Sequence, residues 1–434
     1  MIAQQEATTS AAALPIEPGR AAAAVGTAPA MASFWARSAA TAGSRVVLVA
    51  LGIAASVLTA RALGPAGLGA LTVMLTLGTL AVQFINLGLP SALSWQVAAD
   101  RSRLPQLLGA SLLWGTGVGT ACACGLYLFF QAVPSLSPIA STTLLAAALA
   151  WIPLGLLLLL LLGLLLGLDR LSEYNAAPVI QAAVGLAVVL ALFRAGRTDV
   201  QAFYLASFVP LAATCCALAV WLHHRASRVA LPSRALLRQA AGYSLRAWLS
   251  LFFSFTVLKF DLLMIARMLG ETDAGLYAIA ASAGEFVVLP FAALGTVVFP
   301  AVAGSAVQWP FVRRVTIKAA LALLPALVLA PFLAEPLVVL VFGTAYAAAV
   351  PALLWLLPGV YLLGINTVLM HYFAGIGMPR VAVISPALAT ALNVALNLIL
   401  LPRLGIAGAA IGSTAAYGAM LLCSLLYIRH RQTP

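Results

Sequence analysis

The sequence predicts an all-α polytopic membrane protein, with about 12 transmembrane helices in two pseudo-symmetric six-helix bundles. Hydrophobic residues make up 63% of its 434 residues and charged residues only 8%, whereas roughly a quarter of a soluble domain is charged. Most charges stand between apolar runs of the ~20 residues that a helix needs to cross a bilayer. Uninterrupted apolar runs such as Leu154–Leu168 lack the alternation of a membrane barrel, which leaves helices as the spanning structure.

A repeat supports the division into two bundles. The segment Ala60–Gly69 returns as Ala266–Gly275 with its first Ala, its Arg, its first Leu and both outer glycines unchanged. Each copy joins two long apolar runs. Two halves that share one helix–turn–helix joint are typical of an internally duplicated transporter, in which the substrate path lies between the repeats.

The apolar runs, and the polar, Gly and Pro residues between them, place the spans in order along the chain. The predicted spans lie at approximately 40–60, 67–92, 106–131, 143–167, 176–193, 201–222, 244–266, 275–303, 316–333, 350–370, 381–401 and 406–428. Residues 334–349 either extend the ninth span or form a short external segment. We expect the Leu-rich run of the fourth span to face lipid.

The basic residues between the spans indicate the orientation. Most of the 23 Lys and Arg residues fall on alternate loops and in the tails, and the positive-inside rule makes that side cytoplasmic. Both termini are therefore expected in the cytoplasm. The net charge of +12 is then explained by topology, so we expect no nucleic-acid partner.

These features divide the chain into two bundles with polar segments around them. Residues 1–33 lack a strongly apolar segment after a basic start, so they do not resemble a signal peptide, and Met31 is a candidate start. The predicted parts are a flexible cytoplasmic tail at 1–38, a six-helix bundle at 39–222, a basic cytoplasmic linker at 223–242, a second bundle at 243–428 and a cytoplasmic tail at 429–434.

Several kinds of chemistry find no support in the sequence. The five cysteines form no CxxC pair, so we expect no disulfide, no metal site and no cofactor. Gly115–Gly119 resembles a phosphate loop only in composition and lacks the following Lys, so helix packing explains it better. The expected external loops are short and no DxD-like pair appears, which argues against a glycosyltransferase, polymerase or ligase. The protein is not expected to be an enzyme.

Three stretches resemble bacterial polysaccharide flippases of the multidrug/oligosaccharidyl-lipid/polysaccharide exporter superfamily. The first is the joint Ala60–Gly69, followed by Asn86–Leu89. The second is Asp261 with the joint Ala266–Gly275 and then Leu276-Tyr277. The third holds Asn393, Asn397-Leu398 and Pro402–Ala410, near the expected eleventh–twelfth span joint. The similarity runs from about residue 40 to the end, and the order and spacing of the motifs carry it.

The resemblance implies a flippase in the inner membrane of a bacterium. Such proteins move an undecaprenyl-pyrophosphate-linked oligosaccharide from the inner to the outer leaflet for O-antigen, capsule or exopolysaccharide synthesis. Two six-helix bundles rock around a central, often cationic cavity. Besides the lipid-linked oligosaccharide and the bilayer, a polysaccharide polymerase complex is a candidate partner. The lipid II flippase of this superfamily usually has fourteen spans, so twelve argue against that member. Met378-Pro379-Arg380 departs slightly from the family pattern.

Charges inside the spans are the first candidates for a site, because each costs about 2.5–3.5 kcal/mol to insert. Lys259 and Asp261 lie in the seventh span and Glu285 in the eighth. Counting ~1.5 Å per residue from the external joint places Lys259 roughly 13 Å deep and Glu285 roughly 15 Å deep. Lys259 either forms a salt bridge with Glu285 or contacts the substrate pyrophosphate. Two residues apart on a helix, Lys259 and Asp261 point in different directions, and Asp261 either makes a structural polar contact or couples a cation.

Four further residues complete the candidate substrate cavity. Arg45 lies in the first span and either reaches the headgroups or faces the inward mouth of the cavity, where a guanidinium suits a phosphate. Arg246 occupies the corresponding neighbourhood of the second repeat. Asn393 and Asn397, four residues apart, share one helix face, and either bond to a neighbouring helix or contact sugar.

Other functions stay open beside the flippase. A cation-coupled multidrug exporter would have the same architecture, but such exporters favour acidic residues in the cavity, and Lys259 and Arg45 are basic. A scaffold for polysaccharide assembly that transports nothing is a third possibility, and inert Lys259, Arg45 and Asp261 would favour it. No ATP-binding motif occurs, so any energy is expected from an ion gradient or from downstream consumption of the product.

Overall fold

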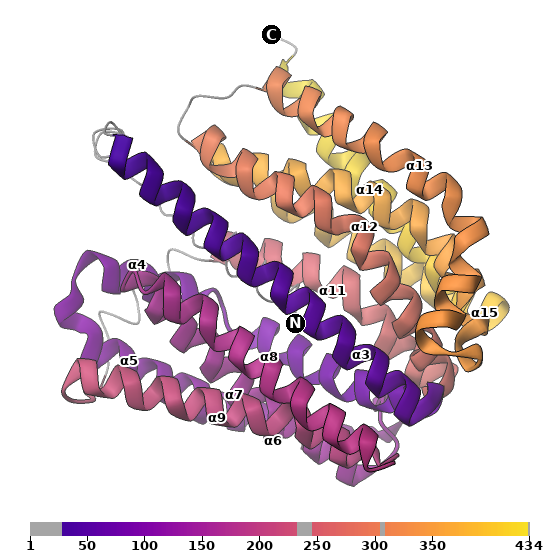
Figure 1. The fold of residues 1–434 in the computed structure, drawn as a ribbon, viewed down its shortest axis with the longest axis horizontal. Coiled ribbons are helices and arrows are strands. Elements are labelled where there is room, and N and C mark those ends of the chain that lie inside the picture. Colours follow the sequence, from indigo (N-terminus) through magenta and orange to yellow (C-terminus); the bar gives the residue numbers. More distant parts are fainter. Residues whose placement is uncertain (1–27, 232–244, 304–308, 433–434) are drawn as a thin grey trace. The chain divides into compact units, whose positions relative to one another are not determined.

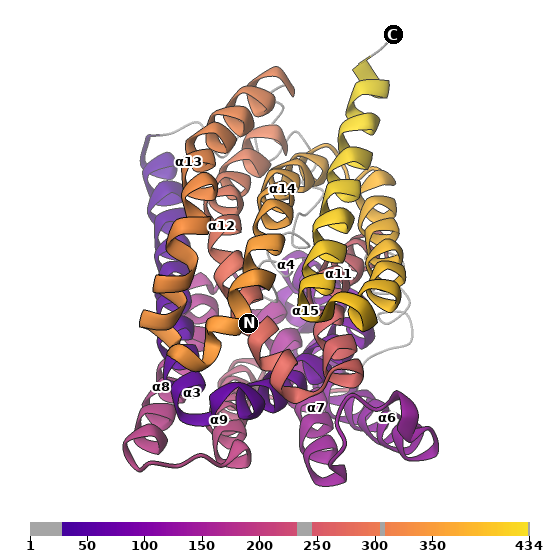
Figure 2. The ribbon, with the colours of Figure 1, turned by 90° about the vertical axis from the view of Figure 1, so that its right-hand side faces the viewer.

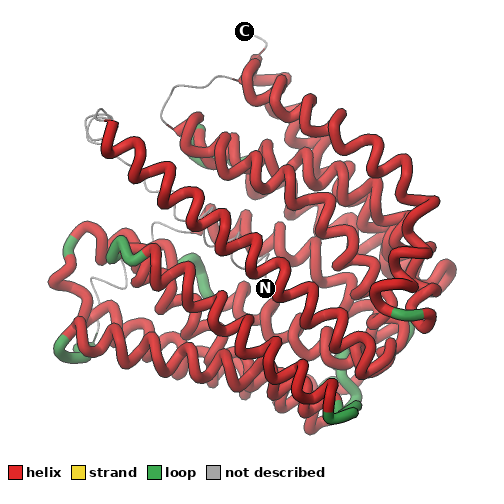
Figure 3. Tube along the Cα trace, in the orientation of Figure 1, coloured by secondary structure: helices red, strands yellow, loops and turns green. Residues whose placement is uncertain are grey.

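The computed structural model describes residues 28–231, 245–303 and 309–432, and every regular element in these ranges is helical (Figure 3). Most of the expected linker, from residue 232 on, and the first 27 residues of the expected tail lie outside the described residues. The described chain forms two compact units. The all-α prediction is confirmed.

The first unit holds α3 up to Ala62 and the chain from Leu77 to Trp248. Its helices follow one another along the chain with short connections (Figure 1). They are α3 (Ala28–Ile85), α4 (Leu89–Ala99), α5 (Leu104–Leu112), a π-helical turn at Leu113–Val118, α6 (Gly119–Ala132), α7 (Thr142–Gly167), α8 (Leu171–Arg194) and α9 (Val200–Ala226), with 3₁₀ turns at Arg101–Arg103 and Pro134–Leu136.

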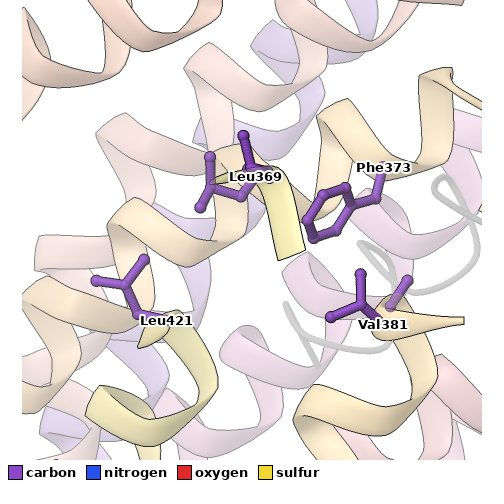
Figure 4. Close-up of a cluster of buried hydrophobic side chains, with 6 residues drawn as sticks. Leu369, Phe373, Val381 and Leu421 are labelled. Carbon is purple, nitrogen blue, oxygen red and sulfur yellow. The ribbon is translucent and has the colours of Figure 1, made fainter. Parts of the chain in front are cut away.

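The second unit holds Leu63–Thr76 of α3 and the chain from Leu249 on. Within it, α14 packs against both α12 and α15 (Figure 2). One apolar cluster of this unit gathers Leu369 and Phe373 of α14 with Val381 and Leu421 of α15 (Figure 4). The helices are α11 (Leu245–Met268), α12 (Glu271–Ala303), α13 (Trp309–Phe342), α14 (Val350–Gly375) and α15 (Val381–Gln432), with a 3₁₀ segment at Thr344–Ala349 between α13 and α14.

Two of the long helices each contain two spans. Ten described helices are long and apolar enough to cross a membrane, and α3 and α15 are each broken at one glycine, Gly64 (φ 66°) and Gly405 (φ 57°). A positive φ is strained for any residue with a Cβ, so glycine permits the turn. Pro65 follows the first break at the start of the next helical segment, where proline is tolerated. Ten helices with two internal breaks make twelve spans, as predicted.

The Leu-rich α7 corrects one expectation. We expected its run of leucines to face lipid, yet 72% of its most apolar stretch is buried, against 11% in Arg101–Ala132. Close approach of neighbouring helices explains the burial. A Cβ on Gly115 would lie 2.9 Å from the Cα of Leu157, and one on Gly163 would lie 2.6 Å from the carbonyl oxygen of Pro90. Small residues let membrane helices pack backbone to backbone.

The expected second span, 67–92, is interrupted. α3 ends at Ile85, Leu87 (φ 47°) and Gly88 (φ 74°) turn the chain, and α4 begins at Leu89. The break frees carbonyl groups, and two indoles bond to them: Trp114 Nε1 donates to Ile85 O at 3.2 Å and Trp248 Nε1 to Gln83 O at 2.9 Å. Such partners make broken helices tolerable in a membrane.

Two other boundaries differ from the prediction. α3 begins at Ala28 rather than at about 40, because the Ala-rich sequence before the first span favours helix. α13 continues to Phe342, and a 3₁₀ segment follows. Residues 334–349 therefore both extend the ninth span and form a short connection.

Candidate functional site

An ion pair joins α11 and α12 of the second unit. Lys259 Nζ lies 2.7 Å from Glu285 Oε1, and the side chains keep 27% and 40% of their exposure. The pair at a common level of the two helices is the arrangement that the helical rise predicted. Next to Glu285, Gly284 faces α14, where an added Cβ would lie 3.1 Å from Val360 Cγ2. The close approach fixes the backbone that carries Glu285.

Asp261 lies in a separate, buried cluster on the same helix, with only 2% of its surface exposed. Tyr277 of α12 donates its hydroxyl to Asp261 Oδ2 at 2.5 Å, and Ser413 of α15 donates to the same oxygen at 3.1 Å. Asp261 Oδ1 accepts from the backbone N–H of Leu262 at 2.8 Å. Three helices therefore converge on one carboxylate, which receives the donors that a buried charge requires.

The cluster continues along α15 through two asparagines. Asn393 Nδ2 donates to Ser413 Oγ at 3.0 Å, and Asn397 Nδ2 donates to Asn393 Oδ1 at 3.0 Å. These residues are 1% and 0% exposed. Asn393 and Ser413 stand on opposite sides of the break at Gly405, so hydrogen bonds link the two spans of α15. Of the two alternatives for these asparagines, helix–helix bonding is the one observed.

One acceptor in this cluster has no partner. Asn397 Oδ1 is buried and makes no hydrogen bond with any described residue. An unpaired buried oxygen is costly and calls for an explanation. The other oxygens of this hydrogen-bonded cluster are those of the Asp261 carboxylate, the Asn393 side-chain carbonyl and the Ser413 hydroxyl. Oxygen ligands of this kind suit a hard cation.

The two clusters face different ways from α11. Lys259 bonds to Glu285, whereas Asp261 bonds to Tyr277 and Ser413. The prediction that Lys259 and Asp261 point in different directions from their helix is therefore confirmed. The ion pair keeps partial exposure, whereas the carboxylate of the second cluster is closed in. The first arrangement can exchange partners with a ligand, and the second can bind only a small ion or a proton.

The two remaining basic candidates belong to the first unit, whereas the ion pair and the carboxylate cluster belong to the second. Arg45 lies in the first segment of α3, in the first unit, and is half-buried. Arg246 lies in the first turn of α11, and its side chain is outside the described part of the structure. The equivalent placement of these two arginines in the repeats, and their place in the cavity, stay predictions.

Sequence reasoning missed Tyr277 and Ser413 as partners of Asp261. Tyr277 closes the motif Ala274–Tyr277 after the second joint, and Ser413 directly follows Gly412, whose added Cβ would lie 3.0 Å from Asn397 Oδ1. A hydroxyl residue next to a glycine inside an apolar span was the sequence feature that could have indicated a buried hydrogen bond at this position.

The long apolar helices define a multi-pass helical membrane protein. The profile of the polysaccharide biosynthesis protein family matches residues 35–305. The chain belongs to this family. No curated protein matches the chain.

Solved transporter structures share the fold. A lipid II flippase, MurJ, in an inward closed conformation has a TM-score of 0.73 and 13% identity, and the match covers 90% of this chain and 87% of that chain. An inward-facing multidrug resistance MATE family transporter of the MOP superfamily has a TM-score of 0.68 and 17% identity, with 88% and 94% covered. A MOP superfamily transporter from Pyrococcus furiosus, described as having a binding pocket of reverse polarity, has a TM-score of 0.58 and 16% identity, with 91% and 94% covered.

Proposed function

We propose that this protein is a flippase for an undecaprenyl-pyrophosphate-linked oligosaccharide. It would move the lipid from the inner to the outer leaflet of a bacterial inner membrane by alternating access, with both termini in the cytoplasm. The product would supply O-antigen, capsule or exopolysaccharide synthesis, with a polysaccharide polymerase complex as a further partner. Membership of the polysaccharide biosynthesis protein family and the fold shared with a lipid II flippase support a lipid-linked substrate.

The single observation that carries the proposal is the partly exposed positive charge of Lys259 inside a spanning helix. The Lys259 side chain keeps 27% exposure despite the ion pair. A pyrophosphate headgroup carries several negative charges, and moving it across the bilayer core requires compensating positive charge. Lys259 would supply that charge at depth. Arg45 and Arg246 would meet the headgroup nearer the cytoplasmic mouth, as phosphate-binding arginines do.

Deletion of the gene in its host tests the proposal. Lipid-linked oligosaccharide should build up in the cytoplasmic leaflet, and surface polysaccharide should disappear. Wild type and Lys318→Ala should restore it, because Lys318 is an exposed lysine in the third turn of α13. Lys259→Ala should not. Full rescue by Lys259→Ala at normal expression would remove this lysine from the mechanism.

The second candidate is a cation-coupled multidrug exporter. The Asp261 cluster with the unpartnered Asn397 Oδ1 favours cation coupling, and the fold shared with a multidrug resistance transporter agrees with it. Normal surface polysaccharide in the deletion strain, together with new sensitivity to cationic drugs, would favour the exporter. For the exporter, Asp261→Asn should abolish the dependence of transport on the cation gradient in proteoliposomes.

A further inference from the structure

Glu285 already supplies Lys259 with the anionic partner that a phosphate ligand would otherwise be. Its carboxylate oxygen lies 2.7 Å from Lys259 Nζ, which is the distance of a charge-assisted hydrogen bond. The ammonium has three N–H donors but a single positive charge, and the Glu285 carboxylate already balances that charge. Carboxylate and phosphate therefore compete for one ammonium group.

In the part of the chain that the structure describes, no second carboxylate bonds to Lys259. Asp261, two residues away, already accepts from Tyr277, Ser413 and the Leu262 amide. It is 2% exposed, so it cannot turn toward Lys259 without leaving those donors unpaired. The Lys259 ammonium pairs instead with Glu285 of the neighbouring helix. Within the described part of the chain, Glu285 is the carboxylate that forms an ion pair with this lysine.

The pair is also free to exchange. The side chains keep 27% and 40% exposure, whereas a fully buried pair would be strongly held. The backbone of Glu285 is held by the contact of Gly284 with α14. Displacement would therefore change the side-chain torsions of Glu285 and leave the helix in place.

We propose that Glu285 is a displaceable counter-ion: it holds Lys259 in the empty transporter, yields it to the diphosphate of the substrate, and takes it back on release. This inference rests on the proposed function. A bare ammonium inside the membrane is costly, so the internal carboxylate lets the empty protein return with its charge balanced. Competition by the same carboxylate keeps the substrate from binding too tightly to leave.

The test measures binding and transport separately. Full-length protein in nanodiscs is titrated with farnesyl diphosphate, and with farnesol as the probe without charge. Glu285→Gln should bind the diphosphate about tenfold more tightly than wild type. This factor lies between the small energy of an exposed ion pair and the large energy of a buried one, because the pair is partly exposed. Affinity for farnesol should not change. Transport of the lipid-linked oligosaccharide should become slower, because Lys259 then holds the ligand. Lys259→Gln should weaken diphosphate binding at least about tenfold.

Controls separate this role from a structural one. Glu335→Gln removes an exposed acid from α13 and should match wild type. Glu285→Asp keeps the charge but retracts it by one methylene, and should bind the diphosphate with intermediate affinity, which keeps the test decisive if Glu285→Gln does not fold. Unchanged or weaker binding by folded Glu285→Gln, or by Glu285→Asp in its place, would overturn the inference while leaving the proposed function standing. If wild type does not bind the diphosphate, the result contradicts the proposed function itself, and with it the inference that depends on it.

Discussion

At the residue scale, two charged groups on one helix have opposite surroundings. Asp261 is enclosed by Tyr277, Ser413 and the Leu262 amide, whereas Lys259 has one partner and partial exposure. The helical rise was enough to predict the level that Lys259 and Glu285 share, because they lie on consecutive helices. The bond from Ser413 to Asp261 spans more than a hundred residues, and no periodicity in the sequence indicates which helices meet across that separation.

The Tyr277 hydroxyl should therefore contribute more to the stability of the protein than a typical tyrosine hydroxyl. Tyr277→Phe removes a donor from a buried carboxylate and should lower the free energy of unfolding by ~1.5–3 kcal/mol. The matched control is Tyr361→Phe, since the Tyr361 hydroxyl donates to a neutral backbone carbonyl, Ala320 O, at 2.8 Å, and its loss should cost only ~0.5–1.5 kcal/mol. Denaturant titration of both variants in detergent gives the comparison. Equal losses would show that the Asp261 charge does not strengthen the bond.

At the element scale, composition could predict helices but not what surrounds them. A leucine side chain packs as favourably against lipid as against another helix. The Leu-rich sequence of α7 therefore did not indicate that this helix is buried. The glycines held that information, because Gly115 and Gly163 mark where backbones come close. The break between α3 and α4 was missed for a related reason: Asn86–Gly88 is a short motif inside an otherwise continuous apolar run.

A methyl group should be tolerated at one glycine of the first unit and not at another. Gly163→Ala would place its Cβ 2.6 Å from the Pro90 carbonyl oxygen and should destabilise the protein by ~1–3 kcal/mol. Gly125→Ala meets nothing within 4 Å and should stabilise α6 by up to ~1 kcal/mol through helix propensity. Thermal unfolding in detergent separates the two. A Gly163→Ala protein as stable as wild type would mean that α4 and α7 pack more loosely than described.

At the scale of the whole molecule, the predicted architecture holds because it follows from duplication and from length. Twelve spans follow from the ten apolar helices and the breaks at Gly64 and Gly405. The candidate site was predicted only in part. The residue types were visible, but the division into an exposed ion pair and a closed carboxylate cluster depends on contacts among α11, α12 and α15.

The orientation predicted from Lys and Arg can be checked by labelling single cysteines in a variant without the five native ones. Thr198→Cys lies in the connection between α8 and α9, and Ser227→Cys lies just after α9. With both termini cytoplasmic, a membrane-impermeant maleimide added to intact cells should label position 198 and not position 227. Permeabilised cells should show labelling at both positions. The reverse pattern in intact cells would invert the topology.

The repeated joints contact each other inside the second unit. A methyl group on Gly69 would overlap the backbone carbonyl of Glu271, and one on Gly275 would overlap that of Pro65. Gly69→Ala and Gly275→Ala should each cost ~1–3 kcal/mol of stability. Together they should cost less than the sum, because the shift that admits one methyl group makes room for the other. Gly43→Ala, which meets nothing within 4 Å, is the control. Strict additivity would show that the two sites are independent.

The reciprocal contact of the joints has an evolutionary consequence. Pro65 and Glu271 are equivalent positions of the repeat, as are Gly69 and Gly275, so each joint presents to the other the same surface that it receives. This is the isologous geometry of a twofold homodimer. An ancestral half would have met its own copy at this point, and one mutation there would have entered the contact twice. In the present chain each of the two glycines is still constrained by the backbone of the other joint, because an added methyl group would overlap it.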